Sequence, residues 1–116
     1  MPWAVEFHTE LAAEFADLPE AVQDELVAHV RLLAEFGPTL GRPAVDTLKG
    51  SRIANLKELR FTAAGGVWRV AFAFDGKRIA VLLAAGDKRG KAEPRFYKAL
   101  IATAERRFAT WGAGEG

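Results

Sequence analysis

Hydrophobic and polar residues follow two different rhythms in the first third of the chain. Residues 3–7, WAVEF, alternate between apolar and polar side chains, which predicts a first strand. An apolar stripe at helical spacing runs from Leu11 to Leu18, and Pro19 ends that helix. A second helix begins at this proline and has its own apolar stripe, formed by Val22, Leu26, Val30 and Leu33. We expect the two helices to form an antiparallel or bent pair.

The middle of the chain predicts a long connection followed by three strands. Gly37 and Pro38 stop the second helix and open a connection, residues 37–54, that is long for a compact domain. Three apolar runs follow, NLKELRF, GVWRVAFAF and RIAVLLAA, at residues 55–61, 66–74 and 78–85. The segments between them, TAAGG and DGK, are typical of hairpin turns. These runs are expected to form an antiparallel meander, and the first strand must join its edge.

The end of the chain predicts a basic loop and a final helix. The loop GDKRGKAEP, residues 86–94, precedes an apolar stripe on Tyr97, Leu100 or Ile101, Ala104, Phe108 and Trp111. Residues 110–116 are expected to fray because the terminal GAGEG is rich in glycine. The predicted order β-α-α-β-β-β-α gives an α+β fold in one domain, residues 1–116. It has an antiparallel or mixed sheet of about four strands, two N-terminal helices on one face, and a C-terminal helix.

The central hairpin can be placed in register from its apolar residues. If its apolar residues share one buried face, Phe61 pairs with Trp68 and Leu59 with Val70. A slip of one residue would expose one apolar set to water, so this register is well specified. Residues 63–66, AAGG, are left as the loop.

The same register places Arg60 directly opposite Arg69 on the face away from the N-terminal helices. Like charges directly opposite across a strand pair are destabilising. One interpretation is that both arginines are solvated and that Glu58, diagonal to Arg69, neutralises one of them. The alternative is a shallow open trough beside the small Ala71 and Ala73, in which paired arginines bind a phosphodiester.

Charge is distributed unevenly, although the net charge is only +1. Residues 1–48 hold nine acids and two bases, whereas residues 49–98 hold twelve bases and four acids, which gives nets of −7 and +8. This asymmetry favours a polyanion-binding surface, although two halves that attract each other would show the same composition. The cations expected to bind RNA are Lys49, Lys57, Arg52, Arg89, Lys91, Arg95 and Lys98.

The sequence lacks the motifs of several enzyme classes. It has no cysteine, which excludes disulfides and thiolate metal sites, and its two histidines, His8 and His29, are assigned surface or capping roles. There is no Walker loop, Rossmann glycine pattern or Gly-x-Ser-x-Gly. Neither a signal peptide nor an apolar run of about 20 residues is present. We therefore expect a cytoplasmic protein without metal, cofactor or membrane partner.

Three long segments resemble a known family. LGRPAVDTLKGSRIANLKELRF, GVWRVAFAFDGKRIAVLLAAGDKRGK and FYKALIATAERRF are similar to the phage-derived HigB branch of the RelE/ParE toxin superfamily, over nearly the whole chain. The resemblance implies a toxin of a type II toxin–antitoxin system, an endoribonuclease that cuts mRNA on the ribosome. It also implies an antitoxin partner with a helix-turn-helix DNA-binding domain. ParE-like relatives share the fold but poison DNA gyrase, so that target stays open, as does a non-toxic nucleic-acid-binding relative.

The resemblance also assigns roles to individual residues. Arg69 matches the arginine of the family's strand motif, and Glu58 and Arg60 match its ELR pair. In a metal-free mechanism the two arginines stabilise the phosphorane charge, and Glu58 takes the proton of the 2′-hydroxyl. A salt bridge to Arg69 is expected to lower the pKa of Glu58. Other HigB toxins use histidines near the basic loop, where this chain has none; its candidate acids are Lys88, Lys91 and Tyr97.

Overall fold

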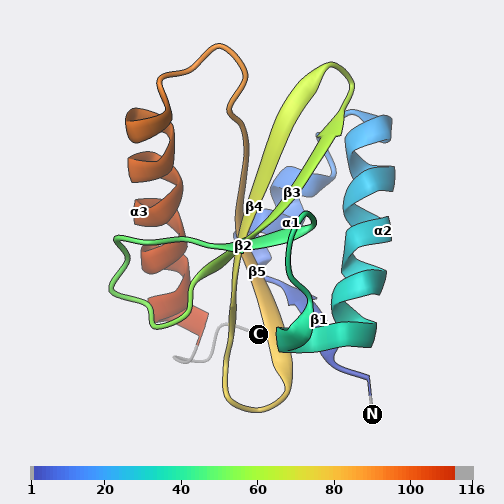
Figure 1. The fold of residues 1–116 in the computed structure, drawn as a ribbon, viewed down its shortest axis with the longest axis vertical. Coiled ribbons are helices and arrows are strands. Elements are labelled where there is room, and N and C mark those ends of the chain that lie inside the picture. Colours follow the sequence, from blue (N-terminus) through green and yellow to red (C-terminus); the bar gives the residue numbers. More distant parts are fainter. Residues whose placement is uncertain (1, 112–116) are drawn as a thin grey trace.

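A five-stranded mixed sheet with helices on both faces forms the fold (Figure 1). The structure, a computed structural model, describes residues 2–111. Its elements are β1 (Ala4–Phe7), α1 (Thr9–Phe15), α2 (Glu20–Phe36), the 3₁₀ turn η1 (Gly37–Thr39), β2 (Val45–Thr47), β3 (Lys57–Ala63), β4 (Gly66–Phe74), β5 (Ile79–Asp87) and α3 (Glu93–Trp111). The predicted element order is confirmed. One short strand, β2, is added within the segment that was expected to be a loop.

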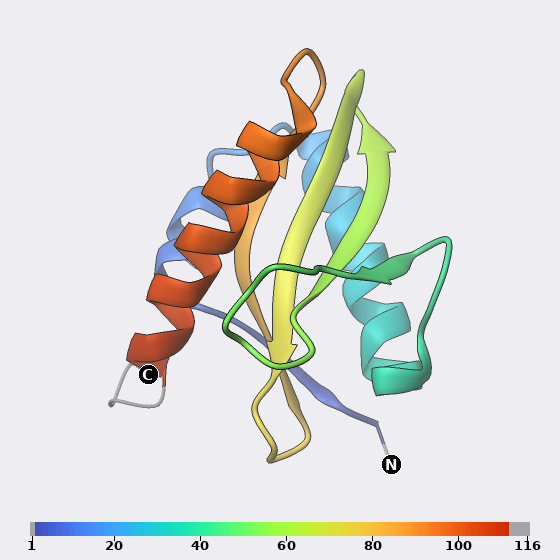
Figure 2. The ribbon, with the colours of Figure 1, turned by 60° about the vertical axis from the view of Figure 1, so that its left-hand side comes forward.

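The first strand joins the edge of the meander, as predicted. The strand order is β1-β5-β4-β3-β2, in which β1 pairs with β5 in parallel and the other neighbours are antiparallel. The added strand β2 pairs with β3 at the opposite edge of the sheet (Figure 2). This pairing places Asp46 beside Glu58. The connection before β3 is therefore partly ordered by backbone pairing.

The two N-terminal helices cover one face of the sheet. Leu11 of α1 and Leu26 and Leu33 of α2 are fully buried against the apolar face of the central hairpin. His8 precedes α1 and caps it by accepting a hydrogen bond from the Glu10 N–H. These packed stripes are the ones that the apolar spacing predicts.

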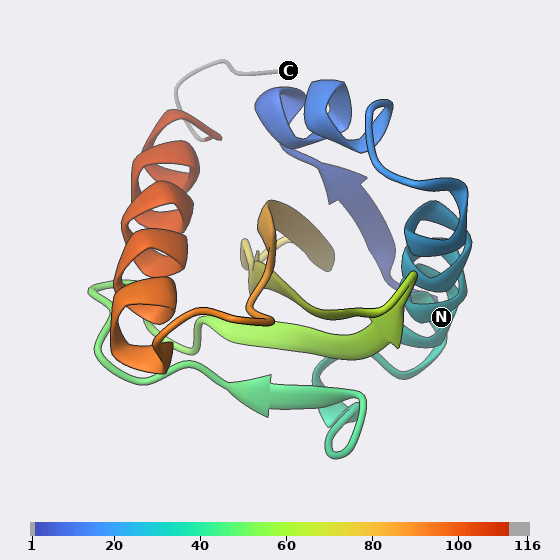
Figure 3. The same cartoon turned by 90° about the horizontal axis from the view of Figure 1, so that it is seen from above.

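The opposite face of the sheet is covered by α3, so the prediction of an open trough there is wrong. Ala71 and Ala73 are 0% and 1% exposed, and Phe96, Leu100 and Ala104 of α3 pack against the same cluster. The small alanine side chains leave room for the helix to approach the strands. Figure 3 shows α3 and α2 on opposite sides of the sheet. The predicted frayed tail also needs correction: residues 110 and 111 belong to α3, and residues 112–116 lie outside the described part.

The register predicted for the central hairpin is confirmed. Arg60 pairs with Arg69, and the turn is tighter than expected because Ala63 pairs with Gly66. The two turn residues, Ala64 and Gly65, have positive φ values of 50° and 76°. Within residues 2–111, no helix is long and apolar enough to cross a membrane.

Candidate active site

Four of the predicted catalytic side chains meet where β3 and β4 pass beneath the N-terminal part of α3. Arg69 Nε lies 3.7 Å from Glu58 Oε1, and Arg60 Nε lies 3.8 Å from Glu58 Oε2. Arg69 Nε also donates a hydrogen bond of 3.2 Å to the Tyr97 hydroxyl. One carboxylate thus stands close to both arginines, and it offsets the repulsion between them across the strand pair.

The cluster has a buried floor and a more accessible rim. The side chains of Glu58 and Arg69 are 6% and 7% exposed, whereas that of Arg60 is 30% exposed. Arg69 Nη1 donates to the carbonyl of Trp68 at 2.9 Å, which holds the guanidinium under the helix. The expectation that both arginines lie on an open face is therefore wrong for Arg69. Arg60 and the half-buried Tyr97 are the members nearest solvent.

The pKa of the Glu58 carboxyl is raised, which corrects the expected decrease. Burial raises this pKa and outweighs the hydrogen bond of Tyr97 and the charges of Arg69 and Arg60, all of which lower it. In addition, Glu58 Oε1 is buried without a hydrogen-bond partner among the described residues. A carboxylate with a raised pKa and an unsatisfied oxygen is suited to accept a proton.

The Tyr97 hydroxyl lies next to both Glu58 and Arg69. Burial raises the pKa of Tyr97, the hydrogen bond of Arg69 lowers it, and Glu58 raises it. The net increase keeps the hydroxyl protonated at neutral pH. The hydroxyl can therefore pass its proton to the Glu58 carboxylate while it receives another.

A second carboxylate, Asp46, reaches the rim from β2. Asp46 Oδ2 lies 3.6 Å from Arg60 Nη1 and 2.7 Å from Arg42 Nη2. The hydrogen bond of Arg42 is the main cause that lowers the pKa of Asp46. Sequence reasoning missed this residue because the three-residue strand β2 carries no recognisable pattern. The only signal in the sequence is an acid inside the long connection of residues 37–54.

The basic loop is fastened to the tip of the β3–β4 hairpin. Asp87 Oδ1 accepts hydrogen bonds of 2.9 Å from the backbone N–H groups of Val67 and Arg89. The Lys88 N–H donates to the Val67 carbonyl at 2.8 Å, and Arg89 Nη1 donates to the Gly65 carbonyl. Asp87, which sequence reasoning did not single out, therefore fixes the loop that carries the predicted cations.

Lys88 is connected to the cluster by its ion pair with Glu93. Its ammonium is 2.6 Å from Glu93 Oε1, and its side chain is 19% exposed. The pKa of Glu93 is lowered mainly by Lys88, with smaller contributions from the charges of Arg69 and Arg60. Glu93, at the start of α3, is thus a further site residue that sequence reasoning missed.

The residues predicted to bind RNA divide into three groups. Arg52 is held by Glu105 of α3, through its backbone N–H at 2.7 Å and its guanidinium at 3.3 Å. Lys91 and Arg95 line a separate cleft of about 850 Å³ between α1, β5 and α3. The remaining cations neither contact Glu105 nor line the cleft; they are Lys49, Lys57, Arg89 and Lys98.

Neither histidine belongs to the cluster. His8 is fully buried; besides capping α1, its Nε2 lies 3.0 Å from Thr110 Oγ1, so its capping role is confirmed and a surface role is wrong. His29 contacts the Glu25 carbonyl at 2.9 Å and packs on the Phe61 ring. Residues 2–111 contain no group of three or more histidine or acidic side chains that could hold a metal ion.

Three comparisons place these observations among known proteins. A family described as "Phage derived protein Gp49-like" matches residues 13–109. "Putative toxin HigB3" of Mycobacterium tuberculosis is 46% identical over 86 residues, which cover 74% of this chain and 73% of that protein. "Putative toxin HigB2" of the same organism is 47% identical over 87 residues, 73% of this chain but 43% of that longer protein. A mutant of the E. coli toxin RelE in the free state has the same fold, with a TM-score of 0.60 at 16% identity over 88% of this chain and 96% of that one.

Proposed function

Because this chain belongs to the Gp49-like family and is a HigB-like toxin of the RelE superfamily, we propose that it inhibits translation by cleaving mRNA on the ribosome. The observation that supports this most directly is the buried Glu58 carboxylate. It has a raised pKa and a free oxygen, and it lies against two arginines and close to a tyrosine hydroxyl. A proton acceptor beside guanidinium groups is suited to phosphodiester cleavage by an RNA 2′-hydroxyl, which needs a base for the hydroxyl and cations for the developing charge.

The reaction uses the RNA as its own nucleophile. The 2′-oxygen forms a bond to the adjacent phosphorus and loses its proton, while the bond from phosphorus to the 5′-oxygen breaks. Tyr97 receives the 2′-proton as it passes its own to Glu58, because the Glu58 side chain is only 6% exposed and does not meet the RNA directly. Lys88, on the rim, gives a proton to the departing 5′-oxygen. The products are a 2′,3′-cyclic phosphate and a free 5′-hydroxyl.

The two arginines have different tasks in this scheme. Arg60, which is 30% exposed, contacts the phosphate oxygens. Arg69 is buried, so it acts through its neighbours: it donates a hydrogen bond to the Tyr97 hydroxyl and balances the charge of Glu58. Electrostatic groups arranged in advance around developing charge often supply the largest share of catalysis. No step in this scheme uses a metal ion.

A toxin of this type requires an inhibitor in its own cell, and we assign that role to a cognate antitoxin. The two M. tuberculosis relatives are named as toxins, which supports a toxin–antitoxin pair for this chain. We expect the antitoxin to carry a helix-turn-helix DNA-binding domain and to be encoded beside the toxin. The toxin itself then contacts DNA only through that partner.

The test is to induce the chain without its partner while growth and RNA ends are followed. We expect growth arrest and new mRNA 5′ ends inside coding regions, with 5′-hydroxyl termini. Tyr97→Phe and Glu58→Gln should abolish these ends, whereas Glu35→Gln, an exposed carboxylate on α2, serves as the matched control. Normal growth at confirmed soluble expression would refute the toxin role. Growth arrest with intact mRNA and defective DNA supercoiling would instead identify gyrase as the target.

A further inference from the structure

The strand β5 extends beyond its neighbour β1, and within residues 2–111 nothing pairs with the rest of that edge. β1 pairs with residues 79–82 only, and its last backbone bond is from the His8 N–H to the Leu82 carbonyl. The chain then turns into α1, while β5 continues to Asp87. Exposed strand edges are templates for pairing with another chain, and proteins normally shorten or cover them.

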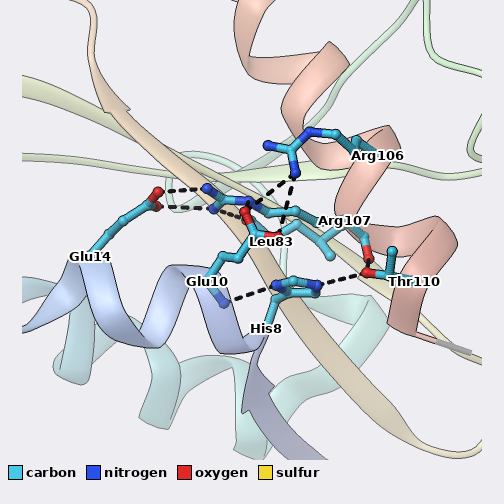
Figure 4. A network of polar contacts seen from close by, with 7 residues as sticks. All are labelled: His8, Glu10, Glu14, Leu83, Arg106, Arg107 and Thr110. Carbon is cyan, nitrogen blue, oxygen red and sulfur yellow. Dashed lines mark hydrogen bonds and ion pairs between the residues drawn. The ribbon is translucent and has the colours of Figure 1, made fainter. Parts of the chain in front are cut away.

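The hydrogen-bond pattern shows which backbone groups this free edge presents. The Lys88 N–H donates to Val67, so residue 88 points toward β4, and residues 86 and 84 share that direction because a strand alternates. The N–H and C=O groups of Ala85 and Asp87 therefore point away from β4. Residue 83 also faces outward, but its carbonyl already accepts a hydrogen bond of 2.8 Å from Arg107 Nη1 (Figure 4).

Arg107, which donates a hydrogen bond to the Leu83 carbonyl, marks one end of the free edge. Arg107 is 5% exposed, and its guanidinium reaches Glu14 Oε1 at 3.0 Å, so it joins α3 to both α1 and β5. Nearby, Arg106 pairs with Glu10 at 3.3 Å in the same network (Figure 4). The unpaired edge thus consists of residues 84–87, with α1 and α3 on its two sides.

These residues form the wall of the cleft of about 850 Å³ between α1, β5 and α3. Its apolar lining includes Leu11, Leu18, Trp68, Phe96 and Leu100, and its basic lining includes Lys91, Arg95 and Arg106. The two carboxylates of the cleft are already engaged. Glu14 is bound by Arg107, and Asp87 accepts two backbone N–H groups. Arg106 is paired with Glu10, so the charge that remains available to a partner is the positive charge of Lys91 and Arg95.

We propose that this cleft binds an extended segment of a partner protein, which adds a short strand to residues 84–87 and carries carboxylates toward the basic lining. The proposal rests on the proposed function in one respect, because the partner is taken to be the antitoxin. The unpaired backbone of Ala85 and Asp87 indicates a polypeptide, since strand addition satisfies N–H and C=O groups together. The apolar lining and basic rim indicate a segment with small apolar and acidic side chains. RNA, which could use the cations and the aromatic rings, is the alternative that the experiment separates.

The experiment uses the full chain with the product of the reading frame beside its gene. Hydrogen exchange is measured on the free toxin and on the co-purified complex, and separately with a short single-stranded RNA. Ala85→Pro removes one outward N–H without breaking the ladder to β4, because proline is tolerated where the N–H faces away from the sheet. Arg95→Glu reverses one charge of the cleft that is unpaired among the described residues, and Arg31→Glu on the exposed surface of α2 is its control.

Strand addition predicts slower exchange at Ala85 and Asp87 in the protein complex. Ala85→Pro should arrest growth when induced alone and yet escape neutralisation, with binding weakened about tenfold or more. Arg95→Glu should weaken binding most at low salt, whereas Arg31→Glu should bind as the wild type does. Unchanged exchange at residues 84–87, full neutralisation of a toxic Ala85→Pro, or protection by RNA alone would overturn the inference. A chain that is harmless when induced alone refutes the proposed function, while the exchange data still decide where the partner binds.

Discussion

Replacing each arginine of the facing pair should have very different effects on stability. If like-charge repulsion decided the outcome, Arg60→Ala and Arg69→Ala would both leave the protein as stable or slightly more stable. The structure predicts another result for Arg69. Its side chain is 7% exposed and lies 3.7 Å from Glu58, so its removal leaves a buried carboxylate with one charge partner fewer.

The size of the expected loss of stability follows from the burial of the Arg69–Glu58 ion pair. Removing one member of a buried ion pair typically costs about 3–5 kcal/mol of unfolding free energy. We expect the lower end, about 3 kcal/mol, because Arg60 still lies near Glu58 and the raised pKa lets Glu58 bind a proton instead. For a chain of this length that is a decrease in Tm of about 12 °C. Arg60→Ala should cost less than about 1 kcal/mol, because its ion pairs are partly solvated.

The assay is urea denaturation of the two single variants and of the double variant Glu58→Leu with Arg69→Met. Replacing a buried ion pair by apolar side chains of similar volume is often neutral or stabilising, so the double variant should recover most of the loss. The recovery would show that the cost of Arg69→Ala comes from the uncompensated carboxylate. An Arg69→Ala protein as stable as the wild type would refute this reasoning. It would mean that Glu58 is already neutral in the native protein.

Three further predictions follow from the site. The pKa of Glu58 is higher in the folded than in the unfolded protein, so its contribution to stability decreases as pH rises from about 4.5 through its folded pKa. The unfolding free energy of Glu58→Gln relative to that of the wild type, measured by denaturation at several pH values, should therefore rise over that range. A difference that is independent of pH would contradict the raised pKa. A Cβ at residue 66 would lie 2.7 Å from Asp87 Oδ2, so Gly66→Ala should displace the basic loop and lower the unfolding free energy by about 1–3 kcal/mol in a thermal melt. In the control Gly41→Ala the new Cβ meets nothing within 4 Å, so the unfolding free energy should change by less than about 0.5 kcal/mol. Lys88→Ala should lower the cleavage rate about 10²-fold or more if Lys88 is the acid, while Lys77→Ala, in the turn before β5, should cleave at the wild-type rate; equal rates for both would remove Lys88 from the mechanism.

The alternation of the central hairpin was sufficient to predict its register, because only one pairing buries both apolar sets. That register placed Arg60 opposite Arg69 and Glu58 beside them, which is the geometry observed. Local periodicity also predicted α1 and α2. These features depend on residues that are near one another in sequence or on a period of two, so a single sequence can reveal them.

The burial of the site could not be predicted in the same way. Ala71 and Ala73 suggested an open trough, whereas they are small because α3 packs on them. Small side chains fit either situation, and the docking of a helix from the far end of the chain decides between them. The same docking buries Glu58 and raises its pKa against the effect of two arginines. Asp46 and Glu93 were missed because their roles depend on contacts across the fold.

The ion pairs of the fold also bear on the two explanations of the uneven charge. If the acidic and basic regions mainly attracted each other, many pairs would join residues 1–48 to residues 49–98. Among the described residues, Arg60–Asp46 is such a pair, whereas the acids of α1 are matched by Arg106 and Arg107 from the balanced end of the chain. Several cations of the basic region have no ion pair in the described part, namely Lys49, Lys57, Lys77, Lys91, Arg95 and Lys98. Attraction within the fold therefore accounts for Glu10, Glu14 and Asp46 but leaves the basic excess unmatched, and an unmatched excess of lysine and arginine is what a polyanionic partner would neutralise.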